Sequence, residues 1–417
     1  MSQMLETEQG VTKDQPRIAG RSRRILHIGK YFPPYSGGME TYLRDLMVAQ
    51  TKQGLESTAL VHQSALSLRS NTEQYPAYEQ TLSVTRAAVW ARLLFTPISP
   101  TFPALLHKLI KRDQPDILHL HMPNVSVFWA LLLPRARRIP WVIQWQSDVL
   151  ASEHKLGLRL FYALYKPFES AVLRHSAKII ASSPPYLESS ATLAPFRDKC
   201  EVIPLGIRLP GQVQENLHVA QSAHSQPLRV LAVGRLTYYK GFKYLIRAMV
   251  HVPEATLDLI GSGEEQSALE GLISELGLTA RVQIHSGVSD NQREHFMAKA
   301  DCLCLPSVER TESFGIVLLE AMRSAKPTVI SRVAGSGMSW IVEDGITGLQ
   351  VPPKDTDALA NCLNILQQDR DKIAILGGKG RERFNRYFHI DKSAAEAAKL
   401  YQQVDKWRAQ SQQQDNQ

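Results

Sequence analysis

Residues 302–322 read CLCLPSVERTESFGIVLLEAM, and this stretch decides the fold prediction. Its first part, CLCL, is a short apolar run of the kind found in a buried strand. We expect a helix to begin near Gly315, and its free N–H groups would point back toward the strand end and favour a bound anion. Glu312 lies in the loop before that helix, and Glu320 lies about one and a half turns inside it.

The two acids admit two interpretations. Carboxylates in an apolar neighbourhood need polar partners, and the hydroxyl groups of a sugar or a ribose can donate to them. Alternatively, Glu312 is a capping acid and Glu320 is a surface residue. The second interpretation is weakened because apolar residues flank Glu320 on both sides.

Short apolar runs alternate with helical stretches along most of the chain, which is typical of parallel, doubly wound sheets. The expected strands of the first half are residues 24–28, 58–62, 117–121, 141–145, 178–181 and 202–203. Those of the second half are residues 230–233, 256–260, 282–285, 302–305, 328–330 and 349–351. Expected helices include 39–53, 239–250, 264–276 and about 379–407. We therefore predict an α/β fold with two Rossmann-like domains that face a cleft.

The length of 417 residues suits two domains. The expected division is an N-terminal domain (21–206), a polar linker (207–227), a C-terminal domain (228–380) and a last helix (381–408) that packs back on the N-terminal domain. The polar ends, 1–20 and 409–417, are expected to be disordered. The first of these lacks the apolar core of a signal peptide.

Composition narrows the class of protein. No run of about 18 apolar residues predicts a transmembrane helix. The four cysteines form no CxxC pair, so buried free thiols in a reducing cytoplasm are expected. The formal net charge of +8 lies wholly in residues 1–206, because acids and bases balance in 207–417. This excess indicates either an anionic partner or a solvated basic face.

Two further loops resemble ligand sites. The expected strand 230–233 leads into Gly234, Arg235 and, farther on, Lys240, and two such cations can hold a diphosphate. The strand 256–260 ends in GSGE, whose glycines permit close backbone approach. Taken singly, a pair of surface cations and a tight turn are the commoner explanations.

Together the segments GRLTYYKG (234–241), IGSGEE (260–265) and ESFGIVLLEAM (312–322) resemble the GT-B retaining glycosyltransferases of family 4, group 1. The resemblance extends from about residue 24 to about residue 407. It implies transfer of a hexose, with mannose slightly preferred, from a nucleotide-diphosphate sugar to a saccharide or lipid-linked acceptor in surface polysaccharide or lipopolysaccharide synthesis. It implies neither a metal nor another cofactor, since cations and a helix N-terminus take the place of a metal.

The resemblance also implies roles for residues of the donor half. They are Arg235 and Lys240 for the diphosphate, Glu320 for the ribose, Glu312 for the transferred sugar, Ser313, Phe314 and Gly315 along sugar and phosphate, and Gly261 and Gly263 beside the nucleotide. Across the cleft, Gly37 and Gly38 belong to a GGxE loop that approaches the donor phosphate.

The acceptor half carries a D-x-x-H-x-H pattern that ends in His119 and His121. Strand alternation puts both rings on one face, and we expect His121 to reach the cleft and His119 to be structural. In the family that the chain resembles, many members carry a histidine where this chain has Gln146. Glutamine cannot act as a general base, but front-face attack assisted by the leaving phosphate does not need one, and Asp148 is expected to orient an acceptor hydroxyl.

The departure at Gln146 motivates an alternative, a non-catalytic protein that binds nucleotide-sugar and acts as a partner of another transferase. Release of the nucleotide distinguishes the two functions.

Basic and apolar residues interleave in 155–166, with further arginines at 135–138 and an apolar run at 90–95. This pattern indicates either peripheral contact with the cytoplasmic face of a membrane or an ordinary core helix. Nucleic-acid binding is not expected, because no aromatic-basic RNA motif is present.

Overall fold

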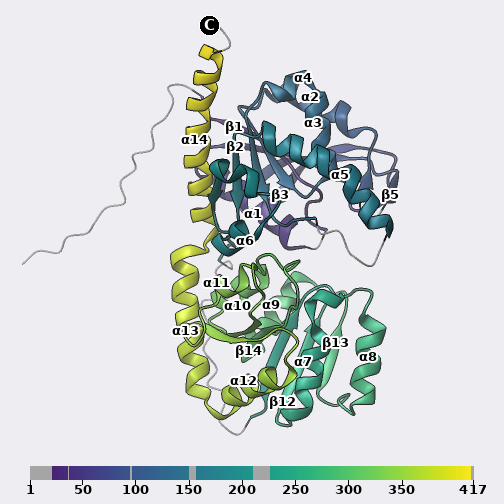
Figure 1. Cartoon of the computed structure of the whole chain (residues 1–417), viewed down its shortest axis with the longest axis vertical. Coiled ribbons are helices and arrows are strands. Elements are labelled where there is room, and N and C mark those ends of the chain that lie inside the picture. The colour runs from purple at the N-terminus through teal and green to yellow at the C-terminus, as the bar shows by residue number, and fades with distance from the viewer. Residues whose placement is uncertain (1–20, 36, 94–95, 150–155, 210–225, 415–417) are drawn as a thin grey trace, which may run out of the picture.

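The chain folds into two α/β domains, one above the other in Figure 1. The computed structural model describes residues 21–35, 37–93, 96–149, 156–209 and 226–414. The expected leader 1–20, most of the expected linker (210–225) and the last residues of the tail (415–417) lie outside the described residues.

The N-terminal domain is built on an eight-stranded sheet in the order β10-β9-β8-β7-β1-β2-β4-β3. Only β3 runs antiparallel to its neighbour. The strands are β1 (Arg24–Ile28), β2 (Glu56–His62), β3 (Asn71–Ala77), β4 (Gln80–Ala87), β7 (Ile117–Met122), β8 (Trp141–Trp145), β9 (Lys178–Ala181) and β10 (Cys200–Val202), with a separate hairpin of β5 (Ala91–Leu93) and β6 (Thr96–Ile98). The helices are α1 (Gly38–Lys52), α2 (Phe102–Asp113), α3 (Trp129–Leu132), α4 (Pro134–Arg137), α5 (Leu156–His175) and α6 (Pro184–Ser189).

The C-terminal domain has a six-stranded parallel sheet in the order β13-β12-β11-β14-β15-β16. Its strands are β11 (Leu228–Val233), β12 (Ala255–Ile260), β13 (Val282–His285), β14 (Cys302–Leu305), β15 (Thr328–Ser331) and β16 (Gly348–Val351). Its helices are α7 (Phe242–Ala248), α8 (Gln266–Glu275), α9 (Asp290–Lys299), α10 (Ile316–Arg323), α11 (Met338–Ile341), α12 (Thr356–Gln368) and α13 (Arg370–Tyr387).

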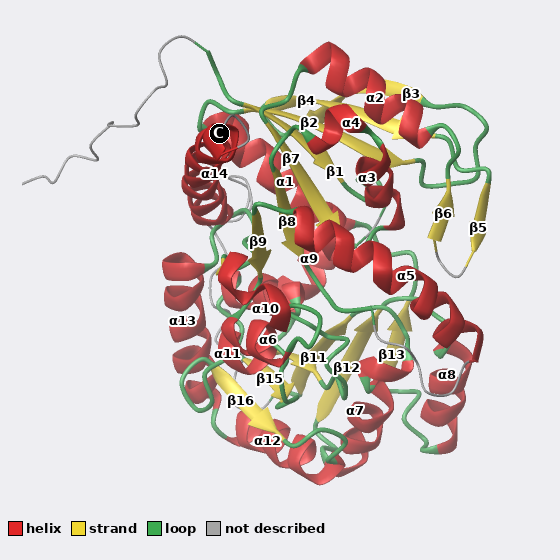
Figure 2. Ribbon diagram, turned by 45° about the horizontal axis from the view of Figure 1, so that its top comes forward, coloured by secondary structure: helices red, strands yellow, loops and turns green. Residues whose placement is uncertain are grey.

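Both sheets are covered on two faces, as Figure 2 shows. Every residue of the central strands β7, β8, β14 and β15 is buried, which is the pattern of parallel sheets between helical layers. The predicted α/β fold with two Rossmann-like domains is therefore confirmed. The four cysteines are free, with Cys302 and Cys304 buried in β14.

Two local predictions were wrong. The hairpin β3–β4 was missed, because its turn has Tyr78 at φ 59° in place of the glycine or asparagine that usually marks such a turn. The helix expected at 239–250 begins only at Phe242, after a 3₁₀ turn over Tyr238–Lys240. Gly241 ends that turn at φ 68°, and a Cβ there would lie 2.2 Å from the Pro306 carbonyl oxygen, so the chain must bend at this point.

The expected last helix is two helices, α13 and α14 (Ile390–Gln414). The chain breaks between them because Ile207 inserts its backbone there: its N–H donates to the Phe388 carbonyl, and its own carbonyl accepts from the Ile390 N–H, both at 3.1 Å. Residues 409–414, expected in the disordered tail, are helical, in keeping with the good helix propensity of glutamine.

Helix α14 lies against α1 of the N-terminal domain, alongside the upper domain in Figure 1. In the described part of the chain, no helix is long and apolar enough to cross a membrane.

Candidate functional site

The loops after β11 and β12 touch each other through their glycines. The N–H of Leu236 donates to the Ser262 carbonyl at 3.0 Å. A Cβ on Gly261 would lie 1.9 Å from the Gly234 carbonyl oxygen, and one on Gly263 would lie 2.3 Å from that of Leu236. The two glycines expected beside the nucleotide thus also allow these two strand-end loops to pack closely.

Lys240 and Glu312 are brought together across 72 residues of sequence. Their side chains form an ion pair and are each only 11% exposed, and the Ser307 hydroxyl donates to the same carboxylate oxygen at 3.3 Å. Arg235, the second cation expected at the diphosphate, is exposed. The described structure therefore holds one predicted cation in a neutral pair and leaves the other at the surface.

Helix α10 begins after Gly315, which adopts φ 83°. Of the three loop residues predicted beside sugar and phosphate, Ser313 accepts through its carbonyl from the Gly337 N–H at 2.8 Å. The Phe314 side chain is buried and meets the ring of Phe388 edge-on, with centroids 6.4 Å apart. The Phe314 ring therefore belongs to the core, and the predicted contact with sugar and phosphate concerns its backbone alone.

Glu320 lies within α10 with its side chain 14% exposed, and a carboxylate oxygen is 3.5 Å from the guanidinium of Arg293 on α9. Burial raises the pKa of Glu320, while Arg293 and Arg323 act in the opposite direction. Arg293 was not predicted as a site residue, because it stands in a polar helix without a motif.

The glycine loop of the N-terminal domain meets α10 across the cleft. A Cβ on Gly38 would lie 3.0 Å from Ile316 Cδ1, and Gly37 precedes the first turn of α1. The two domains therefore approach each other at the start of two helices, the place where the family resemblance predicts the donor phosphate.

Next to this contact lies a small cavity of about 10 Å³, lined among others by Lys30, Glu40, His121 and Gln146. It has room for about one water molecule or one hydroxyl group. Burial raises the pKa of Glu40 and lowers that of Lys30. His121 thus lines this cavity together with Gln146, whereas Lys30 was not predicted as a site residue.

Asp148 does not face open space. Its carboxylate accepts from Trp145 Nε1 at 2.9 Å, from the Ser190 hydroxyl at 2.8 Å and from Arg310 Nη1 at 2.7 Å. Arg310 belongs to the C-terminal domain and also stacks over the ring of Tyr186, 4.1 Å from its centroid. The structure thus gives Asp148, expected to orient an acceptor, the role of an interdomain contact.

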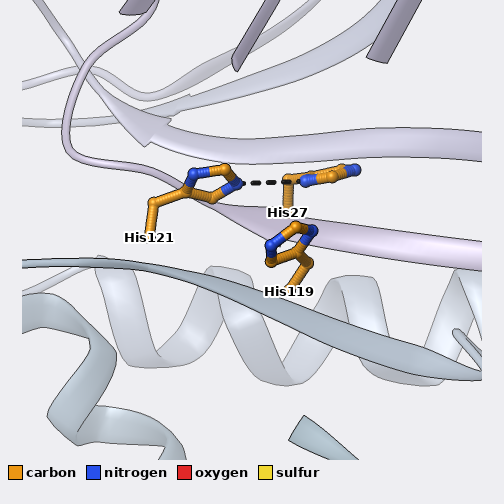
Figure 3. A group of neighbouring side chains, drawn as sticks. All are labelled: His27, His119 and His121. Carbon is orange, nitrogen blue, oxygen red and sulfur yellow. Dashed lines mark hydrogen bonds between the residues drawn. The ribbon is translucent and has the colours of Figure 1, made fainter. Parts of the chain in front are cut away.

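Three buried histidines, His27, His119 and His121, form a group in which one ring nitrogen of each lies within 4.8 Å of the others (Figure 3). The rings of His119 and His121 stack at 4.7 Å, on one face as predicted. His27, on the neighbouring strand β1, was missed, although it occupies the fourth position of a strand that was predicted correctly. Among the described residues, this is the group that could hold a metal ion.

Comparison with known proteins agrees with this arrangement. Residues 37–206 match the model of the glycosyl transferase 4-like domain, and residues 213–383 match that of glycosyl transferases group 1. The chain belongs to the GT-B glycosyltransferases of group 1. The two matches together cover both domains, and the group 1 model matches the C-terminal one.

Individual relatives extend over nearly the whole glycosyltransferase. It is 28% identical to the O-antigen chain mannosyltransferase C of Escherichia coli, covering 91% of this chain and 98% of the relative. It is 26% identical to the D-rhamnosyltransferase WbpZ of Pseudomonas aeruginosa, covering 88% and 92%. The sucrose-phosphate synthase of Thermosynechococcus elongatus superposes with a TM-score of 0.74 at 24% identity, covering 92% and 99%, which shows the shared fold.

Proposed function

We propose that this glycosyltransferase moves a hexose, with mannose preferred, from a nucleotide-diphosphate sugar to a saccharide or lipid-linked acceptor in surface polysaccharide synthesis. The observation that carries the proposal is the meeting of Lys240 and Glu312 beside the start of α10. The names of two relatives, an O-antigen mannosyltransferase and a rhamnosyltransferase, support the class of sugar and product.

In the proposed donor complex, a diphosphate competes with Glu312 for Lys240. The ammonium group and the exposed Arg235 then neutralise the phosphates, together with the N-terminus of α10. Glu312 is released to accept hydrogen bonds from the transferred sugar, and Glu320 accepts from the ribose. These positive groups do the work of a metal ion, so the proposed reaction is metal-independent.

The transfer is proposed to retain the configuration of the anomeric carbon. The bond from that carbon to the phosphate oxygen breaks, and the bond to the acceptor oxygen forms on the same face. The acceptor proton passes to the released phosphate oxygen, so no protein base is required. Gln146, which cannot take a proton, is compatible with this route as a hydrogen-bonding residue at the cavity.

Nucleotide release tests the proposal against the non-catalytic alternative. Purified protein is incubated with GDP-mannose and, separately, with UDP-glucose, and free GDP or UDP is measured with and without isolated membranes as the source of acceptor. Release of GDP that increases with membranes is expected. Tight binding without release of either nucleotide would favour the partner-protein alternative.

We further propose that the N-terminal domain contacts the cytoplasmic face of a membrane that contains anionic lipids. Figures 1 and 2 place α5 and the hairpin β5–β6 on the same side of that domain, and Phe168 of α5 stacks on Phe128 beside α3 at 5.5 Å. Exposed apolar side chains on these elements are Trp90, Leu93, Trp129, Leu132, Leu164 and Phe168. Residue 155 and the side chains of 156–161, part of the predicted basic helix, lie outside the described residues.

Exposed arginines accompany this surface, among them Arg92, Arg135 and Arg138. Cations beside apolar side chains favour anionic headgroups. Co-sedimentation with phosphatidylglycerol vesicles at low salt is expected to fall when Leu132 and Leu164 are both changed to serine. The matched control is Ile375→Ser, an exposed apolar residue of the C-terminal domain. Equal sedimentation of both variants, or none by the parent, would contradict the proposal.

A further inference from the structure

A chain of buried polar side chains runs from helix α14 to the cavity beside Gln146. Tyr401 of α14 accepts from the Gln50 amide nitrogen at 2.9 Å. The amide oxygen of Gln50, on α1, lies 2.8 Å from His27 Nε2. His27 Nδ1 lies 3.1 Å from His121 Nε2, the contact drawn in Figure 3. Helix α14 is thus connected to the cavity through two strands of the sheet.

The orientation of the Gln50 amide group fixes which atom donates and which accepts in each hydrogen bond along these buried side chains. Its amide oxygen accepts from the Ser57 hydroxyl at 2.8 Å, and a carbonyl oxygen can only accept. His27 Nε2 must therefore carry a proton. Burial lowers the pKa of His27 to about 4, so the ring is neutral and its Nδ1 is a bare acceptor.

The same reasoning extends to His121. Because His27 Nδ1 accepts, His121 Nε2 must donate. Burial and the neighbouring His27 lower the pKa of His121 well below its usual value, so this ring is also neutral and its Nδ1 carries a lone pair. That Nδ1 is buried and has no hydrogen-bond partner in the structure. In Figure 3 it lies on the side of the ring away from His27.

The other branch of the chain ends at His119. The Tyr401 hydroxyl is 2.7 Å from His119 Nδ1, and since this hydroxyl accepts from Gln50, its proton is available for His119. His119 and His27 are therefore held by protein groups on the sides that face α1 and α14. Of the three rings, His121 is the one that also lines the cavity.

We propose that His121 is a catalytic residue whose Nδ1 accepts a hydrogen bond from a hydroxyl group of the bound sugar, and that His27, Gln50 and Tyr401 are positioning residues that fix its tautomer. This proposal rests on the proposed function. His121 supplies an imidazole acceptor beside Gln146, which lines the same cavity. The cavity admits about one hydroxyl group, which fits the single free lone pair.

Two substitutions at His121 separate the substrate contact from the contact with His27. In His121→Asn the side-chain amide occupies the position of Nδ1, so an acceptor for the sugar hydroxyl is kept and the donor to His27 is lost. In His121→Gln the amide reaches the position of Nε2, so the donor is kept and the acceptor is lost. The assay is GDP release from GDP-mannose, with GDP binding followed by thermal shift.

The proposal expects His121→Gln to lower kcat/KM about 10- to 100-fold and His121→Asn to lower it several-fold less, with GDP binding unchanged in both. The reverse order would show that His121 matters through His27 alone and would overturn the catalytic role. If the parent protein binds neither GDP nor UDP, the proposed function itself is refuted.

The tautomers can be measured without substrate. Long-range ¹H–¹⁵N NMR of protein labelled at histidine is expected to show His27, His119 and His121 neutral at pH 7, each with its proton on Nε2. Tyr401→Phe is expected to alter the signals of His119 and His27 and to lower kcat more than it raises KM. A proton on Nδ1 of His121, or one equivalent of tightly bound zinc in the purified protein, would overturn the assignment.

Discussion

Removal of the Arg310 side chain is expected to shift the glycosyltransferase toward an open cleft. Arg310 and Asp148 join the two domains at 2.7 Å, with side chains 18% and 6% exposed. Removing one partner of a buried ion pair costs about 3–5 kcal/mol. Trp145 and Ser190 continue to donate to Asp148, so we expect a smaller cost than that range, about 2–3 kcal/mol.

This cost falls on the closed arrangement, because the two partners lie on different domains. A change of 2–3 kcal/mol corresponds to a shift of about 30- to 150-fold in the equilibrium between closed and open forms. Small-angle X-ray scattering of Arg310→Ala is therefore expected to show a larger radius of gyration than the parent. We expect kcat to fall while GDP affinity, which the proposal assigns to the C-terminal domain, is kept.

The control is Arg112→Ala, which removes an arginine paired with the adjacent Asp113 within one domain. When Asp148→Asn is already present, Arg310→Ala is expected to cause a smaller further change in kcat and in radius of gyration, because the two residues are energetically coupled. An unchanged radius of gyration and unchanged kcat in Arg310→Ala would refute the interdomain role of this pair.

Three further predictions concern other residues. Glu169 is 1% exposed, and burial, followed by the charge of Asp148, raises its pKa from 4.5 to about 7. The folded state therefore holds the carboxyl proton more tightly than the unfolded state. The stabilisation that this proton gives the folded state is complete below pH 4.5 and is lost as the pH rises through 7. Urea unfolding of Glu169→Gln against the parent is therefore expected to favour the variant by up to about 3 kcal/mol more at pH 8 than at pH 4.5, and a pH-independent difference would contradict this. Gly261→Ala places a Cβ 1.9 Å from a carbonyl oxygen and is expected to lower the free energy of unfolding by about 3 kcal/mol or more. The control is Gly271→Ala in α8, where a Cβ meets nothing within 4 Å. This control is expected to raise the free energy of unfolding by about 0.5–1 kcal/mol. Lys240→Ala is expected to weaken GDP binding about 10- to 100-fold in calorimetric titration, and unchanged affinity would remove Lys240 from the donor site.

Much of the fold could be predicted because its strands lie in the middle of parallel sheets. The runs CLCL and WVIQW are buried on both faces, so CLCL is wholly apolar and WVIQW is apolar except for Gln144. The edge hairpin β3–β4 was missed for the opposite reason: β3 is half solvated and reads as a polar segment. A two-residue turn without glycine removed the remaining signal.

The candidate site also contains residues that could be predicted from the sequence and residues that could not. Gly261, Lys240 and Glu312 stand in short segments whose order and spacing resemble those of a known family, so they could be found from the sequence. Their partners could not, because tertiary contacts choose them. Arg310 and Asp148 are 162 residues apart, and Gln50 and Tyr401 are 351 residues apart. No local pattern marks such residues as neighbours.

The central claim is that the C-terminal domain binds a nucleotide-diphosphate sugar through Glu312 and Glu320. Isothermal titration with GDP and with UDP, on the parent protein and on Glu320→Ala, tests it most directly. We expect saturable binding of GDP by the parent and an affinity at least about tenfold lower in the variant, because the ribose hydroxyls lose their buried carboxylate acceptor. Binding of neither nucleotide by the parent, or equal affinity in the two proteins, would contradict it.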